Sequence, residues 1–114
     1  LTIVRLTRRP QFLFVQKGRK APRPALIVEA RRRAPDGPAG VGFTATKRIG
    51  NAVIRNRARR RLREAVRQLL PALALPGVDY VFVARQATAE APWASLLDDL
   101  QNALIRLRAE LAPR

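Results

Sequence analysis

The hydrophobic residues of the chain alternate with polar ones, or form short apolar runs, in four segments typical of β-strands. The first predicted strand covers residues 11–17, where Phe12 and Phe14 share one face. A loop is predicted after it, because Gly18 and two nearby prolines interrupt the run. Three further strands are predicted, over residues 25–31, 41–47 and 78–85.

The period of the hydrophobic positions changes from two to 3.6 residues after the Ile-Gly-Asn sequence at 49–51. A helix is predicted from this turn, with Ile54 and Leu62 on its apolar face, and Pro71 is expected to end it. A last helix is predicted after Pro92. The order β-β-β-α-β-α, with a short helical turn allowed before it, predicts an α+β fold with helices against one face of a four-stranded sheet.

The composition limits the chemistry that the chain can perform. Its 114 residues, 47% of them hydrophobic, are typical of one packed domain over residues 1–114. The sequence contains neither Cys nor His, which excludes disulfides and thiolate nucleophiles and removes the commonest acid–base group. Its eight carboxylates are scattered, so we expect no catalytic residue and no metal site on this chain. No apolar run approaches the roughly 20 residues that span a bilayer, which favours the cytoplasm.

The charge is strongly positive and unevenly distributed. The chain carries 23 basic and 8 acidic residues, a formal net charge of +15. Residues 47–67 hold nine of the basic residues and only one acid, Glu64. Such a concentration predicts a polyanionic partner, because like charges repel one another in the compact state unless a partner neutralises them.

The predicted basic helix has the residue types that bind a nucleic-acid backbone. Arginines recur there at four-residue spacing, at positions 55, 59, 63 and 67, so their guanidinium groups can reach successive phosphates. Asn56 adds an amide that can contact a sugar hydroxyl or a base edge.

Two other features of the sequence have two interpretations each. Phe12 and Phe14 are either core residues or base-stacking residues, and the arginines at 31–33 either contact RNA or form a solvated loop.

The segment from Gly42 to Arg67 resembles the protein subunit of bacterial ribonuclease P. The resemblance rests on Lys-Arg-Ile-Gly-Asn-Ala-Val at 47–53 and on the Arg-Asn-Arg helix that follows, and it extends to the Asp-Tyr-Val-Phe-Val-Ala-Arg sequence at 79–85. It implies a four-stranded mixed sheet with a left-handed β-α-β crossover. It also implies a helix that binds the catalytic RNA subunit and a cleft that holds the 5′ leader of precursor tRNA.

Residues are assigned to these two surfaces by their match to the family motif, except Arg67, which continues the four-residue spacing of the arginines. The cleft assignment falls on Phe12 and, on a weaker match, Phe14. The resemblance also implies that the Mg²⁺ needed for leader removal is held by RNA and substrate, with no membrane or small-molecule partner. The RNA-binding assignment covers Lys47, Arg48, Asn51, Arg55, Asn56, Arg57, Arg59, Arg60, Arg63 and Arg67.

Three other functions are compatible with a basic helix of this kind. A structural RNA-binding protein without a processing role has the same basicity. A DNA-binding domain is less favoured, because a uniformly basic row contacts phosphates and discriminates poorly between bases. A membrane-surface helix is disfavoured because the apolar face lacks aromatic residues and is needed for the core.

Overall fold

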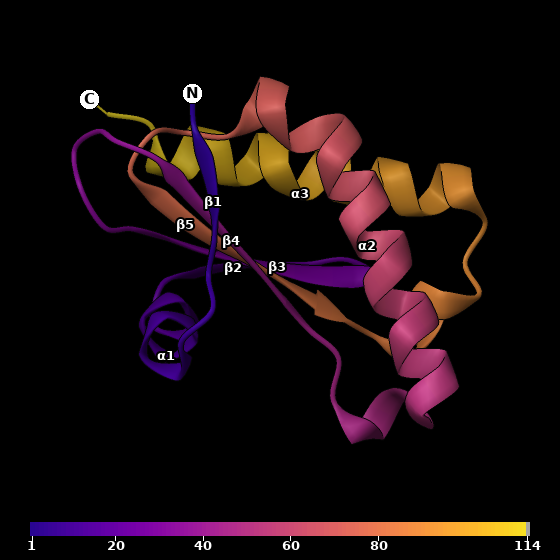
Figure 1. Cartoon of the computed structure of the whole chain (residues 1–114). Coiled ribbons are helices and arrows are strands. Elements are labelled where there is room, and N and C mark those ends of the chain that lie inside the picture. The colour runs from indigo at the N-terminus through magenta and orange to yellow at the C-terminus, as the bar shows by residue number, and fades with distance from the viewer. Residues whose placement is uncertain (114) are drawn as a thin grey trace.

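The computed structural model describes residues 1–113, and in this range the chain forms one mixed sheet with three helices packed on it (Figure 1). Two short 3-10 turns, η1 (Lys47–Ile49) and η2 (Gln86–Ala89), connect elements. The strands are β1 (Ile3–Arg5), β2 (Arg19–Pro22), β3 (Leu26–Arg32), β4 (Ala39–Thr44) and β5 (Val78–Ala84). The helices are α1 (Arg9–Gln16), α2 (Ala52–Leu73) and α3 (Trp93–Leu111).

The order of the strands across the sheet is β1-β4-β5-β3-β2. Strands β1, β4 and β5 are parallel neighbours, whereas β3 pairs antiparallel with β5 and with β2. The parallel pair β4 and β5 is joined through α2, which is the β-α-β unit that we expected. The α+β class is therefore confirmed, but the sheet has five strands instead of four.

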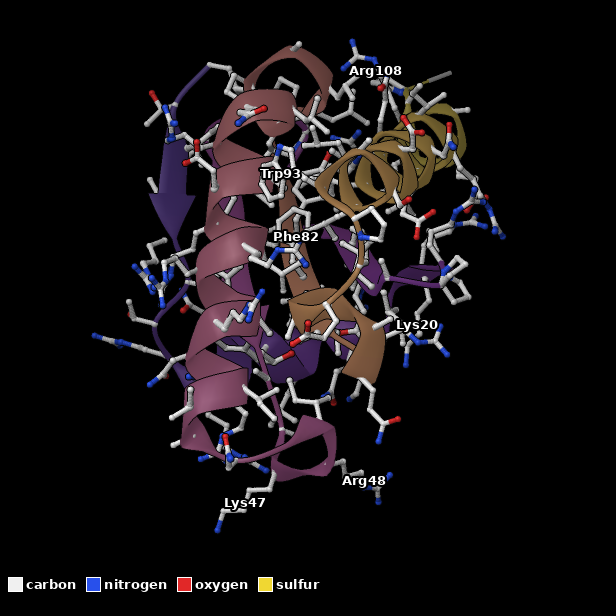
Figure 2. All side chains as sticks on the ribbon, turned by 90° about the vertical axis from the view of Figure 1, so that its right-hand side faces the viewer. Lys20, Lys47, Arg48, Phe82, Trp93 and Arg108 are labelled. Carbon is white, nitrogen blue, oxygen red and sulfur yellow. The ribbon has the colours of Figure 1, made fainter. Side chains whose placement is uncertain are left out.

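The main core lies between one face of the sheet and the helices α2 and α3. Alternate strand residues point to this face, and among them Val28, Tyr80 and Phe82 are almost fully buried. Leu62 of α2 and Leu104 of α3 pack against them. Figure 2 shows Phe82 beneath α2 and α3, beside Trp93 at the start of α3. One face of α2 packs in this core, so the opposite face of the helix is exposed to solvent.

A smaller core on the opposite face holds α1 against the sheet. Leu6, Val15 and Val81 are buried there, with Phe12 partly buried beside them. The ring of Phe12 lies on the backbone of β4, so close that a Cβ at Gly42 would be 2.5 Å from its Cε1 atom. Gly42 therefore makes room for the aromatic ring, and α1 covers only part of this face.

The strand predicted over residues 11–17 is wrong, because residues 11–16 belong to α1 and Lys17 is its C-cap. Both faces of the segment are apolar, so its alternation did not discriminate between the two structures. The overlooked signals are Pro10 at the start of the helix and Gln11, whose Oε1 accepts from the backbone N–H groups of Thr7 and Arg8 at 2.9 Å each. The short N-terminal helix is therefore longer than expected and replaces the first predicted strand.

Two further segments also differ from the prediction. The loop expected after Gly18 contains β2, an edge strand that tolerates Pro22 at its end. The other edge is β1, which pairs parallel with β4 where no strand was predicted. Both are short, and edge strands need little hydrophobic patterning because one side of each faces solvent.

Helix α2 continues to Leu73, two residues beyond the predicted end at Pro71. A proline removes only one N–H donor, and here the carbonyl that loses its partner belongs to the exposed Arg67, where water is available. Because Pro71 lies in the last turn, its fixed φ angle is compatible with the helix.

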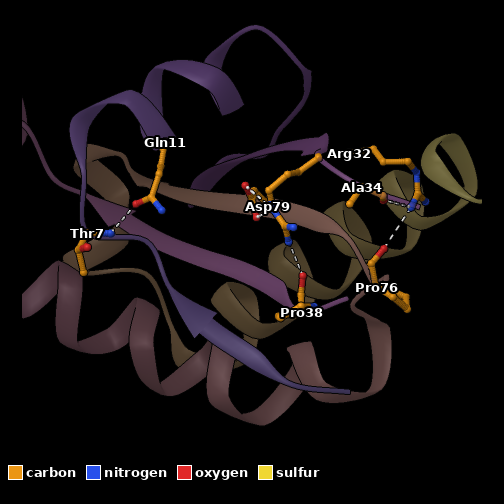
Figure 3. A network of polar contacts seen from close by, with 8 residues as sticks. Thr7, Gln11, Arg32, Ala34, Pro38, Pro76 and Asp79 are labelled. Atoms are coloured by element: carbon orange, nitrogen blue, oxygen red, sulfur yellow. Dashed lines mark hydrogen bonds and ion pairs between the residues drawn. The ribbon is translucent and has the colours of Figure 1, made fainter. Parts of the chain in front are cut away.

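The three consecutive arginines at 31–33 all have partners within the protein. Arg31 stacks on Phe14 with its Cζ atom 4.2 Å from the ring centroid and donates to the Phe14 carbonyl at 3.2 Å. Arg32 donates to three backbone carbonyls, two of which are drawn in Figure 3, and Arg33 pairs with the buried carboxylate of Asp79 at 3.2 Å. These contacts favour the structural interpretation of the triplet over RNA contact.

Candidate nucleic-acid interface

The basic helix α2 begins at a turn that its sequence specifies. Gly50 has a φ angle of +145°, which an L side chain rarely adopts, and a Cβ there would lie within about 3 Å of Ile54. Asn51 is the N-cap, and its Oδ1 accepts from the backbone N–H of Ile54 at 3.0 Å. The turn therefore sets the direction in which α2 leaves η1 and presents the basic pair of η1 next to the first turn of the helix.

The structure brings the predicted RNA-binding residues together on one continuous surface. They lie on η1, on the turn and along the solvent face of α2, and we call them the α2 basic face. Figure 2 shows Lys47 and Arg48 at the end of the molecule where α2 starts. Arg55 and Arg59 are partly buried, and the other members of the set are exposed. A 22-residue helix is about 33 Å long, so the face extends over several phosphate spacings.

The centre of the α2 basic face is held by hydrogen bonds between its own side chains. Arg59 donates from Nη1 to Oδ1 of Asn56 at 2.9 Å and from Nη2 to the Ala45 carbonyl at 3.5 Å. The amide oxygen of Asn56 is thereby occupied, which leaves its NH₂ group as a donor toward solvent. The face is therefore partly preorganised, with a fixed guanidinium beside a fixed amide.

Most of the positive charge on this face is not neutralised within the protein. Arg57 lies 3.7 Å from Glu90 in an exposed pair, and Arg67 binds Glu64 through two hydrogen bonds, which lower the pKa of that carboxyl group. Within residues 1–113, no carboxylate lies within 4 Å of the other cationic groups of the face, those at positions 47, 48, 55, 59, 60 and 63. The surface therefore attracts a polyanion.

Arg61 is the exception among the arginines of α2, because it points into the protein. Its guanidinium donates to the backbone carbonyls of Thr88 and Ala91 and lies 5.7 Å from the ring centroid of Trp93. It therefore joins α2 to the connection between β5 and α3. The family motif does not include this position, and Arg61 was not assigned to the RNA-binding set.

The two predicted cleft residues do not share a face. Phe12 and Phe14 are two residues apart on a helix, about 200° around its axis, instead of on the same side of a strand. Phe12 rests on Gly42, toward the centre of the sheet, whereas Phe14 is covered by Arg31. Only Phe12 is next to the part of the sheet that α1 leaves open.

The open part of the sheet continues from Phe12 as one transverse row. Ile27, Val83 and Thr44 are direct neighbours on three adjacent strands, and all three are partly exposed. The row leads to a hollow of about 590 Å³ whose lining includes Arg48 and Arg85. We call this row and hollow the sheet groove. Among its residues only Arg48 was assigned to a binding surface from the sequence, although the alternation within β3 and β5 would have placed Ile27 and Val83 on this face.

The acidic residues do not form a site for a divalent cation. In the described part of the chain, no three Asp or Glu residues gather in one place. Asp79 is paired with Arg33, Glu29 with Lys20, and Asp99 accepts from the backbone N–H of Ala25. The protein's own donor set therefore does not fit Mg²⁺, which prefers several oxygen ligands in octahedral geometry.

The ribonuclease P family model matches residues 2–108 of this chain. The chain belongs to the ribonuclease P protein family. The ribonuclease P protein component of Caulobacter vibrioides is 53% identical over 112 residues, which cover 97% of this chain and 75% of the relative. The ribonuclease P protein component of Gluconacetobacter diazotrophicus is 48% identical over 101 residues, covering 88% of this chain and 87% of the relative.

Solved structures of family members have the same fold. The ribonuclease P protein of Thermotoga maritima superimposes with a TM-score of 0.75 at 24% identity, covering 90% of this chain and 96% of that one. A mutant of the Staphylococcus aureus protein gives a TM-score of 0.76 at 22% identity, covering 91% of this chain and 87% of that one. In residues 1–113 no helix has the length and apolar character needed to span a membrane. The resemblance seen in the sequence is therefore confirmed at the level of family and fold.

Proposed function

We propose that this chain is the protein component of a ribonucleoprotein ribonuclease P and binds the catalytic RNA through the α2 basic face. The observation that carries the proposal is the set of arginine and lysine side chains along α2 and η1 that lack carboxylate partners within residues 1–113. A surface of this kind binds RNA mainly through its phosphates, with release of counterions. The fixed amide donor of Asn56 adds a contact that can distinguish a ribose or base edge.

The second part of the proposal concerns the substrate. We place the single-stranded 5′ leader of precursor tRNA in the sheet groove, with a base against Phe12 and phosphates near Arg48 and Arg85. The groove supports this function because the ring of Phe12 lies at its start and two guanidinium groups line its hollow, and this combination of an aromatic ring with positive charge binds single strands without strong sequence preference. Phe14 has a weaker claim, since Arg31 already covers its ring.

The chemistry of leader removal is assigned to the RNA partner. The chain has no His or Cys, and its described carboxylates are dispersed, so we propose that Mg²⁺ is held by RNA and substrate. The protein would screen RNA–RNA repulsion and position the substrate, as a subunit of an endoribonuclease that contributes no acid or base of its own. Location in the cytoplasm stays a prediction from the sequence.

Cleavage of precursor tRNA at low Mg²⁺ concentration tests the function. The family's catalytic RNA alone, the protein alone and the two together are compared, and we expect cleavage at the mature 5′ end only with both. Binding without any stimulation of cleavage would favour a structural RNA-binding protein. Cleavage by the protein alone would contradict the assignment of the chemistry to RNA.

The salt dependence of RNA binding tests the α2 basic face. The double variant Arg55→Ala/Arg60→Ala should bind the catalytic RNA more weakly, and the slope of log affinity against log salt should fall by about one unit per lost phosphate contact. The matched control is Arg19→Ala/Arg106→Ala, whose arginines are on β2 and α3. Equal losses in both double variants would mean that only net charge matters and that α2 is not the binding face.

Leader length tests the sheet groove. Phe12→Ala should reduce cleavage of a substrate with a long leader more than of one with a single-nucleotide leader, because only the former reaches the groove. Leu13→Ala, the next residue of α1 and 41% exposed, is the control. Equal losses on both substrates would mean that Phe12 acts only in packing.

A further inference from the structure

A second hollow lies at the other side of α2, away from the sheet groove. It has a volume of about 290 Å³ and is formed by β1, by β4 and by the C-terminal half of α2. Figure 1 shows β1 at the sheet edge on the same side as the end of α2. The match to the family motif assigned no residue to a pocket on this side of α2. Strand β1 was not predicted from the sequence either.

The floor of this hollow is apolar and includes an accessible aromatic ring. Val41, Val66 and Leu70 are buried at its base, and Ile3 of β1 contributes a side wall that is 39% exposed. Phe43 is only partly buried, although its ring is packed against Phe82 with centroids 5.6 Å apart. A rigidly backed ring at the wall of an open hollow provides a surface on which a planar group can stack.

The rim of the hollow is positively charged. Arg5, Arg63 and Arg67 contribute to its lining, and no carboxylate does so. The guanidinium of Arg63 lies over the ring of Phe43, with its Cζ atom 6.0 Å from the ring centroid. Arg5 and Arg63 have no carboxylate within 4 Å in the described part of the chain, whereas Arg67 binds Glu64. An apolar floor inside a cationic rim is complementary to a flat apolar ring with anionic groups on both sides.

We infer that this hollow binds one unpaired nucleotide of the RNA partner. The base would lie against Phe43 and the Arg63 guanidinium above it, and its flanking phosphates would contact Arg5 and Arg67. The inference rests on the proposed function, because Arg63 and Arg67 continue the α2 basic face and would position the RNA strand at the hollow. It adds β1 to the RNA-binding surface and adds a stacked base to a face that otherwise binds RNA mainly through phosphates.

Adenosine 5′-monophosphate and ribose 5-phosphate are suitable probes, because they differ only in the base. Titrations of the full chain are followed by the backbone amide resonances of Arg5 and Phe43 in nuclear magnetic resonance spectra. We expect the nucleotide to bind at least about five-fold more tightly than the sugar phosphate, the low end of the effect of one stacked base. Equal affinities would overturn the inference, because only phosphate attraction would then be present.

Variants locate the effect within the hollow. Ile3→Ala and Phe43→Leu should abolish the preference for the nucleotide and leave sugar-phosphate binding unchanged, whereas Ile105→Ala, an exposed isoleucine on α3, should change neither. Ile3 lies on an exposed edge strand, so its variant tests the inference even if Phe43→Leu weakens the packing against Phe82. An unchanged preference in Ile3→Ala and in folded Phe43→Leu would also overturn it.

Binding of the catalytic RNA separates this inference from the proposed function. We expect Phe43→Leu to lower the affinity for the RNA by about five-fold or more at unchanged salt slope, because it removes a base contact and no charge. If Arg55→Ala/Arg60→Ala weakens binding but Phe43→Leu does not, the α2 basic face stands and the nucleotide site fails. If neither affects binding, the proposed RNA-binding face itself fails.

Discussion

Arg60 and Arg61 are neighbours on α2 with opposite surroundings, and exchanging each for alanine should separate binding from stability. Arg60 is exposed and has no carboxylate within 4 Å among residues 1–113. Arg61 donates to two backbone carbonyls and lies over Trp93. Because arginine and alanine are both good helix formers, the change in helix propensity is small and similar at both positions.

The magnitude follows from the contacts that Arg61→Ala would remove. A hydrogen bond from a charged donor contributes about 1.5–3 kcal/mol, and the contact with the Trp93 ring adds about 0.5–1 kcal/mol. Arg61 is only partly buried, so water replaces some of this, and we expect a loss of about 2–3 kcal/mol in the free energy of unfolding. For a domain of this size the midpoint of thermal unfolding should fall by roughly 8–20 °C. Arg60→Ala should change the free energy of unfolding by less than about 0.5 kcal/mol.

Thermal unfolding followed by circular dichroism measures the stability, and filter binding of the catalytic RNA at a temperature where both variants are folded measures the affinity. We expect Arg60→Ala to weaken binding at unchanged stability, and Arg61→Ala to do the reverse. Midpoints within 2 °C of each other would refute the structural role of Arg61. Equal losses of RNA affinity would refute the distinction between the two faces of α2.

Three further predictions concern residues that fix the fold around these surfaces. Burial raises the pKa of Tyr80, the only tyrosine, so the protonated hydroxyl is favoured in the folded state. The free energy of unfolding should therefore fall as the pH rises above about 10, where the tyrosine of the unfolded chain loses its proton. Tyr80→Phe should lack this loss when unfolding is measured at alkaline pH. Gly50→Ala should lower the free energy of unfolding by about 1–3 kcal/mol in urea titrations, because φ there is +145°, whereas Ala52→Gly, at the exposed start of α2, should cost less than about 1 kcal/mol. Asp79→Asn should lower it by about 1–3 kcal/mol through loss of the pair with Arg33, measured in the same way; no change would show that this pair of a buried carboxylate with an exposed guanidinium contributes nothing to stability.

The parts of the fold that could be predicted are those where burial enforces a period. Strands β3, β4 and β5 lie near their predicted positions, because each has a buried face, and α2 and α3 are specified by apolar residues at helical spacing. The α1 segment could not be assigned by alternation, since it is apolar on both faces. The two edge strands have almost no hydrophobic pattern. Their positions depend on the strands with which they pair, β4 for β1 and β3 for β2.

The two parts of the candidate site also differ in how well the sequence predicts them. The helical part of the α2 basic face was predictable from the sequence spacing, because one long helix presents its charges at a fixed period, whereas its residues on η1 and the turn were assigned by the family motif. The sheet groove was not, since it depends on which part of the sheet α1 leaves uncovered. The misassigned helix also explains why Phe12 and Phe14, expected on one face, are separated by the turn of α1.

Strand β5 is the last strand in the chain but lies in the middle of the sheet. During synthesis, the strands β3 and β4 therefore have no shared neighbour until residues 78–84 have left the ribosome. Residues 1–77, which carry 19 basic and 3 acidic side chains, must wait for that strand before their core can close. Folding thus depends on contacts that are distant in sequence, and such topologies fold slowly. The most highly charged part of the protein is therefore made first and stays without a complete sheet until β5 is added.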